Sequence, residues 1–270
     1  MLGEDRVLQE GLNLIDVIVV AYRTGDVLPR CLESIRADPS VGHVYIVDNS
    51  PGHPLGVLPS EGVTIVEPGE NLGFGNGVNA AAPLVSTEYV AVVNPDLVVQ
   101  KGVFGKCVNF LDENHGVGLL SPRVYVDGSL FRTSEHDASL PRYLSHPVGL
   151  GRIFGVERPT RHHYRTHETD AVNGAFIIAR TSALEQIGWF DKSIFLFGEE
   201  IDMCRRLRRS GWKVVYLADG RVDHLDGYSA AREDDVVIRQ LRRSARVEQL
   251  RRARGVWQAR VYSVLLGLRP

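Results

Sequence analysis

Apolar residues in this chain gather in short continuous runs, which alternate with segments of helical spacing. The run from Tyr89 to Val93 is too short for a helix and rich in valine, which is typical of a strand buried on both faces. Similar runs predict strands over residues 16–22, 44–47, 63–66, 117–120, 172–178 and 213–217, and helices are expected over 28–35, 103–111 and 182–187. This alternation predicts an α/β protein with a mainly parallel, doubly wound sheet.

Polar residues stand where two of these strands end. Asn94-Pro95-Asp96 stops the strand that begins at Tyr89, because proline cannot donate to a ladder and pushes the preceding residue into an extended conformation. Asp48 and Asn49 follow the strand over residues 44–47 in the same way. Open α/β sheets bind ligands at the carboxyl ends of their strands, so Asp96 is a candidate ligand-binding residue. The alternative is that Asp96 merely caps a turn.

A glycine-rich segment covers residues 70–79, with glycines at positions 73, 75 and 77. Glycine lets the backbone turn tightly or approach a ligand closely. The spacing is not that of the dinucleotide fingerprint, which argues against a Rossmann dehydrogenase. The segment is either a binding loop or a turn into a helix that begins at Asn79.

Residues 188–197 are aromatic-rich and lead into Glu199 and Glu200, where the pattern predicts the start of a helix. Adjacent residues of a helix point about 100° apart, so at most one of these carboxylates can face a cleft. The other can interact favourably with the positive end of the helix dipole, at the helix N-terminus. The alternative is a solvated acidic first turn, which leaves the aromatic residues unexplained. His224 follows a later strand and could meet Asp96 and a helix-start glutamate at one sheet edge.

Composition narrows the class of protein. The chain has 270 residues, 44% of them hydrophobic, and a formal net charge of -2, so no global field favours nucleic acid as a partner. Cys31, Cys107 and Cys204 are odd in number and far apart, which predicts reduced, buried thiols in a cytosolic protein. The first residues lack the pattern of a signal peptide, and no run reaches the roughly 18 apolar residues of a membrane span.

Residues 127–170 are expected to be irregular, either a mobile loop or an inserted subdomain. His162, His163 and His167 lie within them and raise the question of a zinc site. A second ligand pair at metal-site spacing is missing from the sequence, so solvated histidines are the better interpretation.

The segment from residue 232 to the end is strongly basic and interleaves arginines with apolar residues. Such a pattern predicts an amphipathic helix, a catalytic domain being expected over residues 1–230 and an extension over 231–270. Three interpretations stay open: a contact with a membrane surface, packing on the catalytic domain, and packing on a second subunit in a homodimer.

Taken in order, these motifs resemble the GT-A inverting glycosyltransferases of family 2, and within them bacterial rhamnosyltransferase-like enzymes. The resemblance extends from about Val17 to Ser229 and rests on residues 17–22, 46–49, 71–79, 94–96, 173–176, 188–191, 198–205 and 222–224. It implies a nucleotide-sugar half at about 14–125 and an acceptor half at about 126–230.

The resemblance also implies roles for individual residues. Asp48 matches the aspartate that accepts a hydrogen bond from the base imide, and Asn94 and Asp96 match the metal motif for Mg²⁺ or Mn²⁺, with His224 completing the site. Asn94 replaces the first acid of that motif and leaves fewer anionic ligands. Glu200 matches the catalytic base, Glu199 being the second candidate and Asp202 an accompanying acid. Further residues are expected to contact the nucleotide-sugar (Tyr22, Asn49, Asn71, Gly73 and Asn79) or the acceptor (Trp189, Phe190 and Asp191).

The implied activity is transfer of L-rhamnose from dTDP-L-rhamnose to a polyprenyl-linked or cell-envelope glycan, on the inner face of the plasma membrane. Alternatives are a UDP-sugar donor, or a catalytically silent protein that binds sugar nucleotides or acts as a scaffold. A nucleotidyltransferase is disfavoured, because residues 22–26 are too short to form its basic glycine-rich loop.

Overall fold

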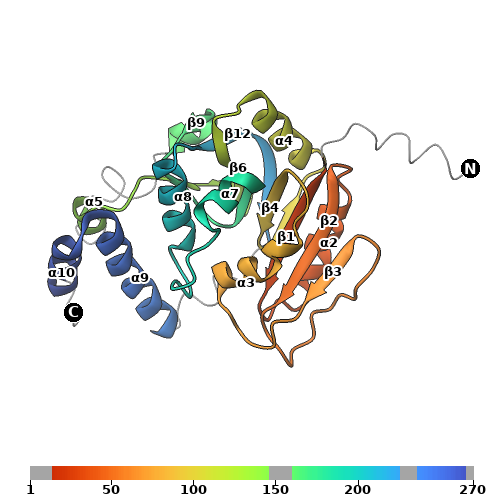
Figure 1. Ribbon diagram of the computed structural model, residues 1–270, viewed down its shortest axis with the longest axis horizontal. Coiled ribbons are helices and arrows are strands. Elements are labelled where there is room, and N and C mark those ends of the chain that lie inside the picture. Colours follow the sequence, from red (N-terminus) through yellow and green to blue (C-terminus); the bar gives the residue numbers. More distant parts are fainter. Residues whose placement is uncertain (1–13, 146–159, 226–235, 266–270) are drawn as a thin grey trace, which may run out of the picture.

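The computed structural model describes residues 14–145, 160–225 and 236–265. A mixed sheet with the strand order β3-β2-β1-β4-β11-β6-β12-β5 forms its centre (Figure 1). The strands are β1 (Ile15–Ala21), β2 (Val41–Asp48), β3 (Val63–Val66), β4 (Tyr89–Val93), β5 (Leu97–Val99), β6 (Val117–Val126), β7 (Ser129–Phe131), β8 (Ser134–Glu135), β9 (His167–Glu168), β10 (Ala171–Val172), β11 (Phe176–Arg180) and β12 (Lys213–His224). β7 and β9 extend this sheet, whereas β8 and β10 form a separate ribbon.

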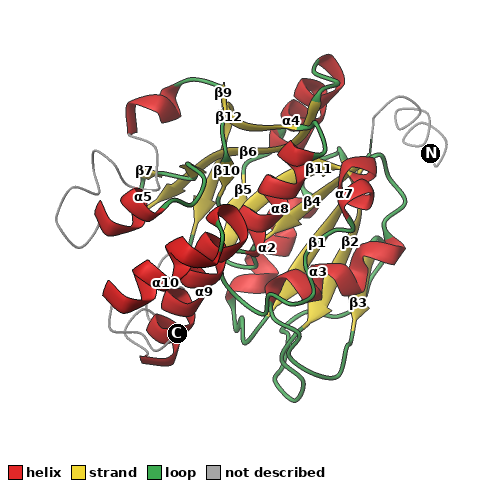
Figure 2. Ribbon diagram, turned by 60° about the vertical axis from the view of Figure 1, so that its left-hand side comes forward, coloured by secondary structure: helices red, strands yellow, loops and turns green. Residues whose placement is uncertain are grey.

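The helices are α2 (Val27–Arg36), α3 (Phe74–Ala81), α4 (Val103–Glu113), α5 (Leu140–Ser145), α7 (Thr181–Ile187), α8 (Glu199–Arg209), α9 (Val236–Arg254) and α10 (Val256–Leu265), with short 3-10 turns η1 (Ala82–Leu84) and η2 (Thr160–Tyr164). Apolar faces of α2 and α4 pack on one side of the sheet, and those of α3, α7 and α8 pack on the other. Figure 2 shows the sheet between these two layers. The predicted α/β architecture is confirmed.

Parallel pairing dominates the first half of the sheet. β1 pairs in parallel with β2 and β4, and β2 with β3, so these four strands end at one edge. β11 then pairs antiparallel with both β4 and β6, while β6 and β12 are parallel. The sheet is continuous across the boundary expected near residue 125, and the division into two halves stays a prediction.

A separate small cluster joins the C-terminal helices to the rest of the chain. Leu250 of α9 and Tyr262 of α10 are buried against Tyr143 of α5. Figure 1 shows α9 and α10 in blue at one end of the molecule, with β3 at the opposite end. Packing on the rest of the chain, which matches one of the three interpretations of this segment, therefore does occur.

Several local expectations need correction. The glycine-rich segment is itself helical, because α3 begins at Phe74 and not at Asn79. The strand expected over 172–178 is interrupted at Asn173 and Gly174, between β10 and β11. Residues 127–145 and 160–170 contain short elements instead of a purely irregular loop. His163 is fully buried, its Nε2 accepting a hydrogen bond from the Ser134 amide, so a solvated histidine is wrong at this position.

The cysteines and the lengths of the helices bear on two further expectations. All three cysteines are buried and free, as predicted. None of the helices in the described ranges is both long and apolar enough to cross a bilayer.

Candidate active site

Strand pairing brings Asp96 and His224 together, although they lie far apart in sequence. Asp96 stands between β4 and β5, and β5 pairs antiparallel with the end of β12, where His224 lies opposite Leu97. The Leu225 amide donates to the carbonyl oxygen of Asp96 at 2.8 Å. His224 Nε2 and the buried Asp96 Oδ2 are consequently 3.5 Å apart. Backbone contacts fix the position of both side chains.

The ends of β1 and β2 add a second group of polar residues to this edge. Ala21 lies opposite Asp48 in the parallel register, so Tyr22 and Asn49 emerge side by side. Asp48 Oδ1 accepts a hydrogen bond from the Ser50 amide at 3.0 Å. Its side chain is half-buried and stands at the carboxyl edge of the sheet, and its role in binding a base stays a prediction.

Asn49 ties the end of β2 to the glycine-rich segment. Its amide nitrogen donates to Asn71 Oδ1 at 3.0 Å and to the Gly73 carbonyl at 2.9 Å, and its oxygen accepts from the Leu72 amide at 2.8 Å. Asn49 is 2% exposed. Through these contacts Asn49 supports residues 71–73. Both polar atoms of its side-chain amide already form hydrogen bonds within the protein.

The glycines of α3 permit close packing against the aromatic segment, residues 188–198. A Cβ on Gly73 would stand 1.9 Å from the Phe195 carbonyl oxygen, and one on Gly75 would stand 3.0 Å from Phe190 Cβ. Asn79 donates to the Phe190 carbonyl at 2.9 Å and accepts from the Phe190 amide at 3.1 Å. Gly73 and Asn79 therefore hold the aromatic segment, whatever contact they make with a nucleotide-sugar.

The three residues expected on the acceptor side occupy different environments. Phe190 is 1% exposed and packs edge-on against Phe74, so its ring supports the segment from inside and does not face an acceptor. Trp189 is half-buried. Asp191 accepts hydrogen bonds from Ser193 and Arg252, which hold the pKa of Asp191 well below its usual value.

Glu200 faces the strand edge. A Cβ on Gly174 would lie 3.5 Å from Glu200 Cβ and 3.7 Å from its Cγ. The next residue, Ala175, accepts a hydrogen bond from the Asn94 amide at 2.9 Å. Glu200 therefore packs beside the residue pair Gly174-Ala175, which is hydrogen-bonded to the turn at Asn94–Asp96. The sequence motif located the glutamate, but Gly174 shows which surface its side chain covers.

Asp202 lies on the opposite side of α8, because residues two apart in a helix point about 200° apart. It is 5% exposed, and Arg206 Nε donates to its Oδ2 at 2.7 Å. Arg252 Nη1 lies 3.4 Å from its other oxygen. These contacts give Asp202 a structural environment of arginines and turn it away from Gly174.

The two adjacent glutamates differ in how much of their surface is exposed. Glu199 is 4% exposed, and its Oε2 makes no hydrogen bond within the described residues. Burial, reinforced by the charge of Glu200, raises the pKa of Glu199 to about 8. Burial also raises the pKa of the half-buried Glu200. With a pKa of about 8, Glu199 retains its proton near neutrality.

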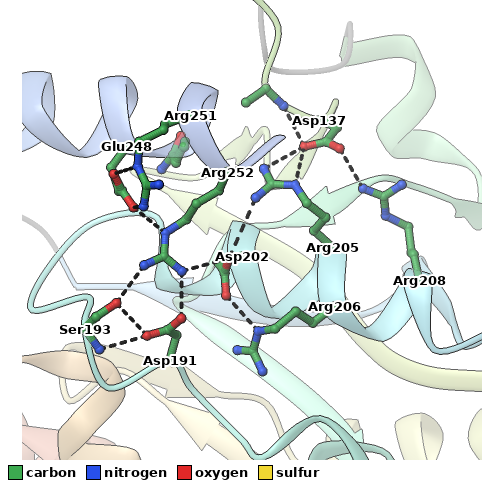
Figure 3. A network of polar contacts seen from close by, with 12 residues as sticks. Asp137, Asp191, Ser193, Asp202, Arg205, Arg206, Arg208, Glu248, Arg251 and Arg252 are labelled. Atoms are coloured by element: carbon green, nitrogen blue, oxygen red, sulfur yellow. Dashed lines mark hydrogen bonds and ion pairs between the residues drawn. The ribbon is translucent and has the colours of Figure 1, made fainter. Parts of the chain in front are cut away.

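An arginine network connects α8 to α9 and the aromatic segment (Figure 3). Arg252 Nη1 donates to Asp191 Oδ2 at 2.7 Å, its Nη2 to Ser193 Oγ at 2.6 Å and its Nε to Glu248 at 2.6 Å. Gln249 packs on Gly198, where a Cβ would stand 1.8 Å from Gln249 Nε2. The N-terminus of α8 is thus held by the C-terminal helix, a contact for which the sequence carries no motif.

The residues at the strand edge suit a divalent cation. A carboxylate and an imidazole converge at Asp96 and His224, and this donor set is compatible with Mg²⁺ or, with its nitrogen ligand, Mn²⁺. Within the described ranges, no cluster of three or more His, Cys, Asp or Glu side chains forms a complete metal site. A cation here would need further ligands from a diphosphate or water.

This architecture is the GT-A fold of glycosyltransferases. The chain belongs to the glycosyltransferase like family 2, whose model matches residues 13–246.

Curated relatives share this family membership. The chain is 27% identical, over 94% of its length and 90% of the relative's, to N-acetylglucosaminyl-diphospho-decaprenol L-rhamnosyltransferase of Mycobacterium tuberculosis. It is 22% identical to a rhamnosyltransferase of Escherichia coli, over 76% of this chain and 80% of that one.

Solved structures share the fold at low identity. A mannosyltransferase from Pyrobaculum calidifontis in complex with GDP-Man and Mn²⁺ matches 97% of this chain and 80% of its own, with a TM-score of 0.60 and 14% identity. GalNAc-T7 with UDP, GalNAc and Mn²⁺ gives a TM-score of 0.63 at 13% identity, over 81% of this chain and 45% of its own.

Proposed function

We propose that this glycosyltransferase moves L-rhamnose from dTDP-L-rhamnose, with inversion, to a lipid-linked glycan. The observation that carries the proposal is the pairing of Asp96 with His224 at a strand edge where the Asn94 amide bonds to Ala175, the neighbour of Gly174, on which Glu200 packs. The relative from M. tuberculosis, which aligns over nearly the whole chain, is named as a rhamnosyltransferase acting on a decaprenol-linked sugar and supports the donor and the acceptor class.

Donor binding is assigned to the ends of β1, β2 and β4. Asp48 accepts a hydrogen bond from the thymine imide, and Tyr22 lies beside it as a second contact. Asp96 and His224, with Asn94 beside them, are the residues that would hold Mg²⁺ or Mn²⁺. The cation, when bound, stabilises the negative charge that the departing dTDP acquires.

Glu200 acts as the general base. Its carboxylate takes the proton of the acceptor hydroxyl while that oxygen forms a bond to the anomeric carbon of rhamnose. The bond between this carbon and the diphosphate oxygen breaks on the opposite face, and dTDP leaves with the electron pair. Configuration at the anomeric carbon inverts, and the proton ends on Glu200.

A UDP-sugar donor is the second candidate. A solved relative of known fold, S. aureus TarS, binds UDP-GlcNAc, and it matches 94% of this chain with a TM-score of 0.59 and 16% identity. The side chains that face the sugar decide between the donors.

Calorimetry with a panel of dTDP- and UDP-sugars, with and without Mn²⁺, tests the proposal. We expect metal-dependent preference for dTDP-L-rhamnose in the wild type and loss of that metal dependence in Asp96→Ala. Preference for a UDP-sugar would overturn the donor but keep the chemistry. Donor binding without any product from a lipid-linked acceptor would instead favour the silent scaffold.

A further inference from the structure

The inner faces of α9 and α10 are already occupied by the protein. Leu250 of α9 and Ala259 and Tyr262 of α10 are buried in the cluster with α5. Arg252 and Gln249 also point inward, toward the aromatic segment and Gly198. The apolar face of α9 is therefore not available to a bilayer, contrary to the simplest interpretation of an amphipathic basic helix.

The outer face of α10 carries exposed apolar side chains on both sides of Arg260. Val256, Trp257 and Val264 are 53%, 71% and 70% exposed. At about 100° per residue these three side chains lie within about 100° of the helix circumference, opposite Ala259 and Tyr262. Leu265, 60% exposed, extends the strip at its end. We call these four residues the α10 strip.

The charge beside the α10 strip is strongly positive. The sequence from residue 236 to residue 265 contains eight arginines and one glutamate, a formal charge of +7, whereas the whole chain carries -2. The remainder of the chain therefore carries -9. Exposed arginines at positions 239, 243, 246, 254 and 260 belong to these two helices. Arg251 and Arg252 pair with the glutamate, Glu248.

This combination selects one kind of partner. An exposed tryptophan with valines suits the boundary between lipid head groups and acyl chains, and arginines are attracted to anionic head groups. A second copy seated on the same face in a two-fold dimer would oppose two surfaces of equal positive charge. We infer that the α10 strip and the neighbouring arginines dock this protein on an anionic lipid surface.

The inference deepens the proposed function, on whose lipid-linked acceptor it rests. A cleft of about 400 Å³ lies between the aromatic segment and α9, lined by Phe195, Phe197 and Leu241 among others. Its wall includes Gly198, the residue before Glu199. α9 forms one wall of this cleft and α10 packs on α9, so docking through α10 would place the membrane one helix away from the cleft.

Co-sedimentation with vesicles of phosphatidylglycerol and phosphatidylcholine tests the inference without any donor present. We expect the full chain to bind anionic vesicles, less at high salt, and the double variant Trp257→Ser/Val264→Ser to bind at least about tenfold more weakly, since each buried side chain contributes more than that factor. Leu58→Ser is the matched control, because Leu58 is 82% exposed but lies in the loop before β3. Its binding should equal that of the wild type.

Three results would overturn the inference: equal binding by the double variant and the wild type, equal binding to neutral and anionic vesicles, or a dimer in sedimentation that the double variant abolishes. Thermal unfolding checks that both variants are folded. Turnover of a short-chain, water-soluble acceptor analogue separates the two proposals. It should be unchanged in the double variant if only docking is lost, whereas an absence of turnover in the wild type would count against the proposed function alone.

Discussion

The two sides of the candidate active site are held in different ways. Asp96 and His224 are positioned by strand pairing, since β5 and β12 align their backbones. Glu200 depends on the orientation of α8, whose first turn is held by contacts with Gly174, Gln249 and Arg252. The metal-binding side is thus built into the central sheet, whereas the base side relies on side chains from distant segments.

This difference indicates which functions can be separated by mutation. Changes in α9 or the aromatic segment should impair transfer while donor binding persists. Changes at the strand edge, such as Asp96→Ala, should weaken metal-dependent donor binding and transfer together. We order the predictions for the base side from the largest expected effect to the smallest.

Glu200→Gln should lower kcat by about 10²- to 10⁴-fold, because it removes the general base while keeping the shape of the side chain. Donor affinity measured by calorimetry should not change. Glu199→Gln is the matched control and should retain most of the turnover. If the two variants exchanged these phenotypes, Glu199 would be the base.

Gly73→Ala should detach the aromatic segment, because the new Cβ would meet the Phe195 carbonyl oxygen at 1.9 Å. Backbone strain adds to this effect, since the φ angle of Gly73 is 78°. We expect a loss of at least about 2 kcal/mol in the free energy of unfolding.

Gly102→Ala shows the cost of a positive φ angle without a clash. Gly102 has φ 85° and ψ 0°, in the left-handed region, with open space around its Cβ position. Gly73 has φ 78° and ψ -178°, a region essentially restricted to glycine, so strain and clash both set Gly73→Ala apart. Gly102→Ala should lose only about 1 kcal/mol, in line with the cost of a left-handed conformation. Equal losses in chemical denaturation of the two variants would contradict the packing argument.

Arg252→Ala should lower kcat about tenfold and leave the KM for the donor unchanged, because it removes the contacts of α9 with Asp191 and Asp202. Arg251→Ala is the control, because Arg251 is exposed and, within the network of Figure 3, its side chain pairs with Glu248 alone. Arg252→Lys should restore part of the rate. A loss shared equally between kcat and donor binding would show that Arg252 acts on overall stability.

Glu199→Gln should change how stability depends on pH. The pKa of Glu199 is raised to about 8 in the folded protein from a usual value of 4.5. Between these values the folded state holds a proton that the unfolded state releases, so stability falls as pH rises through this range. The variant should therefore melt a few degrees higher than the wild type at pH 9, with a smaller gain at pH 5. An equal shift at both values would contradict the assignment.

Sequence patterns predicted the elements whose signal is local. Runs such as Tyr89–Val93 appear as strands, and the helix beginning at Glu199 is confirmed. Their order also revealed the family. α3 was missed at its start, because the low helix propensity of Gly75 and Gly77 is overridden by close packing against Phe190 and Val20.

Contacts between distant segments could not be predicted in this way. Sequence spacing does not show that Phe190 is buried, that Asn79 binds the backbone of Phe190 or that Arg252 reaches Asp191. β5 was missed as well, since its three residues form a strand only by pairing with β12. The strand-edge residues were identifiable from sequence, whereas the support of Glu200 was not.

The contact between Gly198 and Gln249 has a consequence for natural variation. Gln249 is anchored by the hydroxyl of Tyr143, so it cannot move aside for a side chain at position 198. The φ angle of Gly198 is 91°, which favours glycine at this position as well. Homologues are therefore expected to keep glycine at 198 and to vary at 143 and 249 only together, as a record of how the C-terminal helix and α8 evolved together.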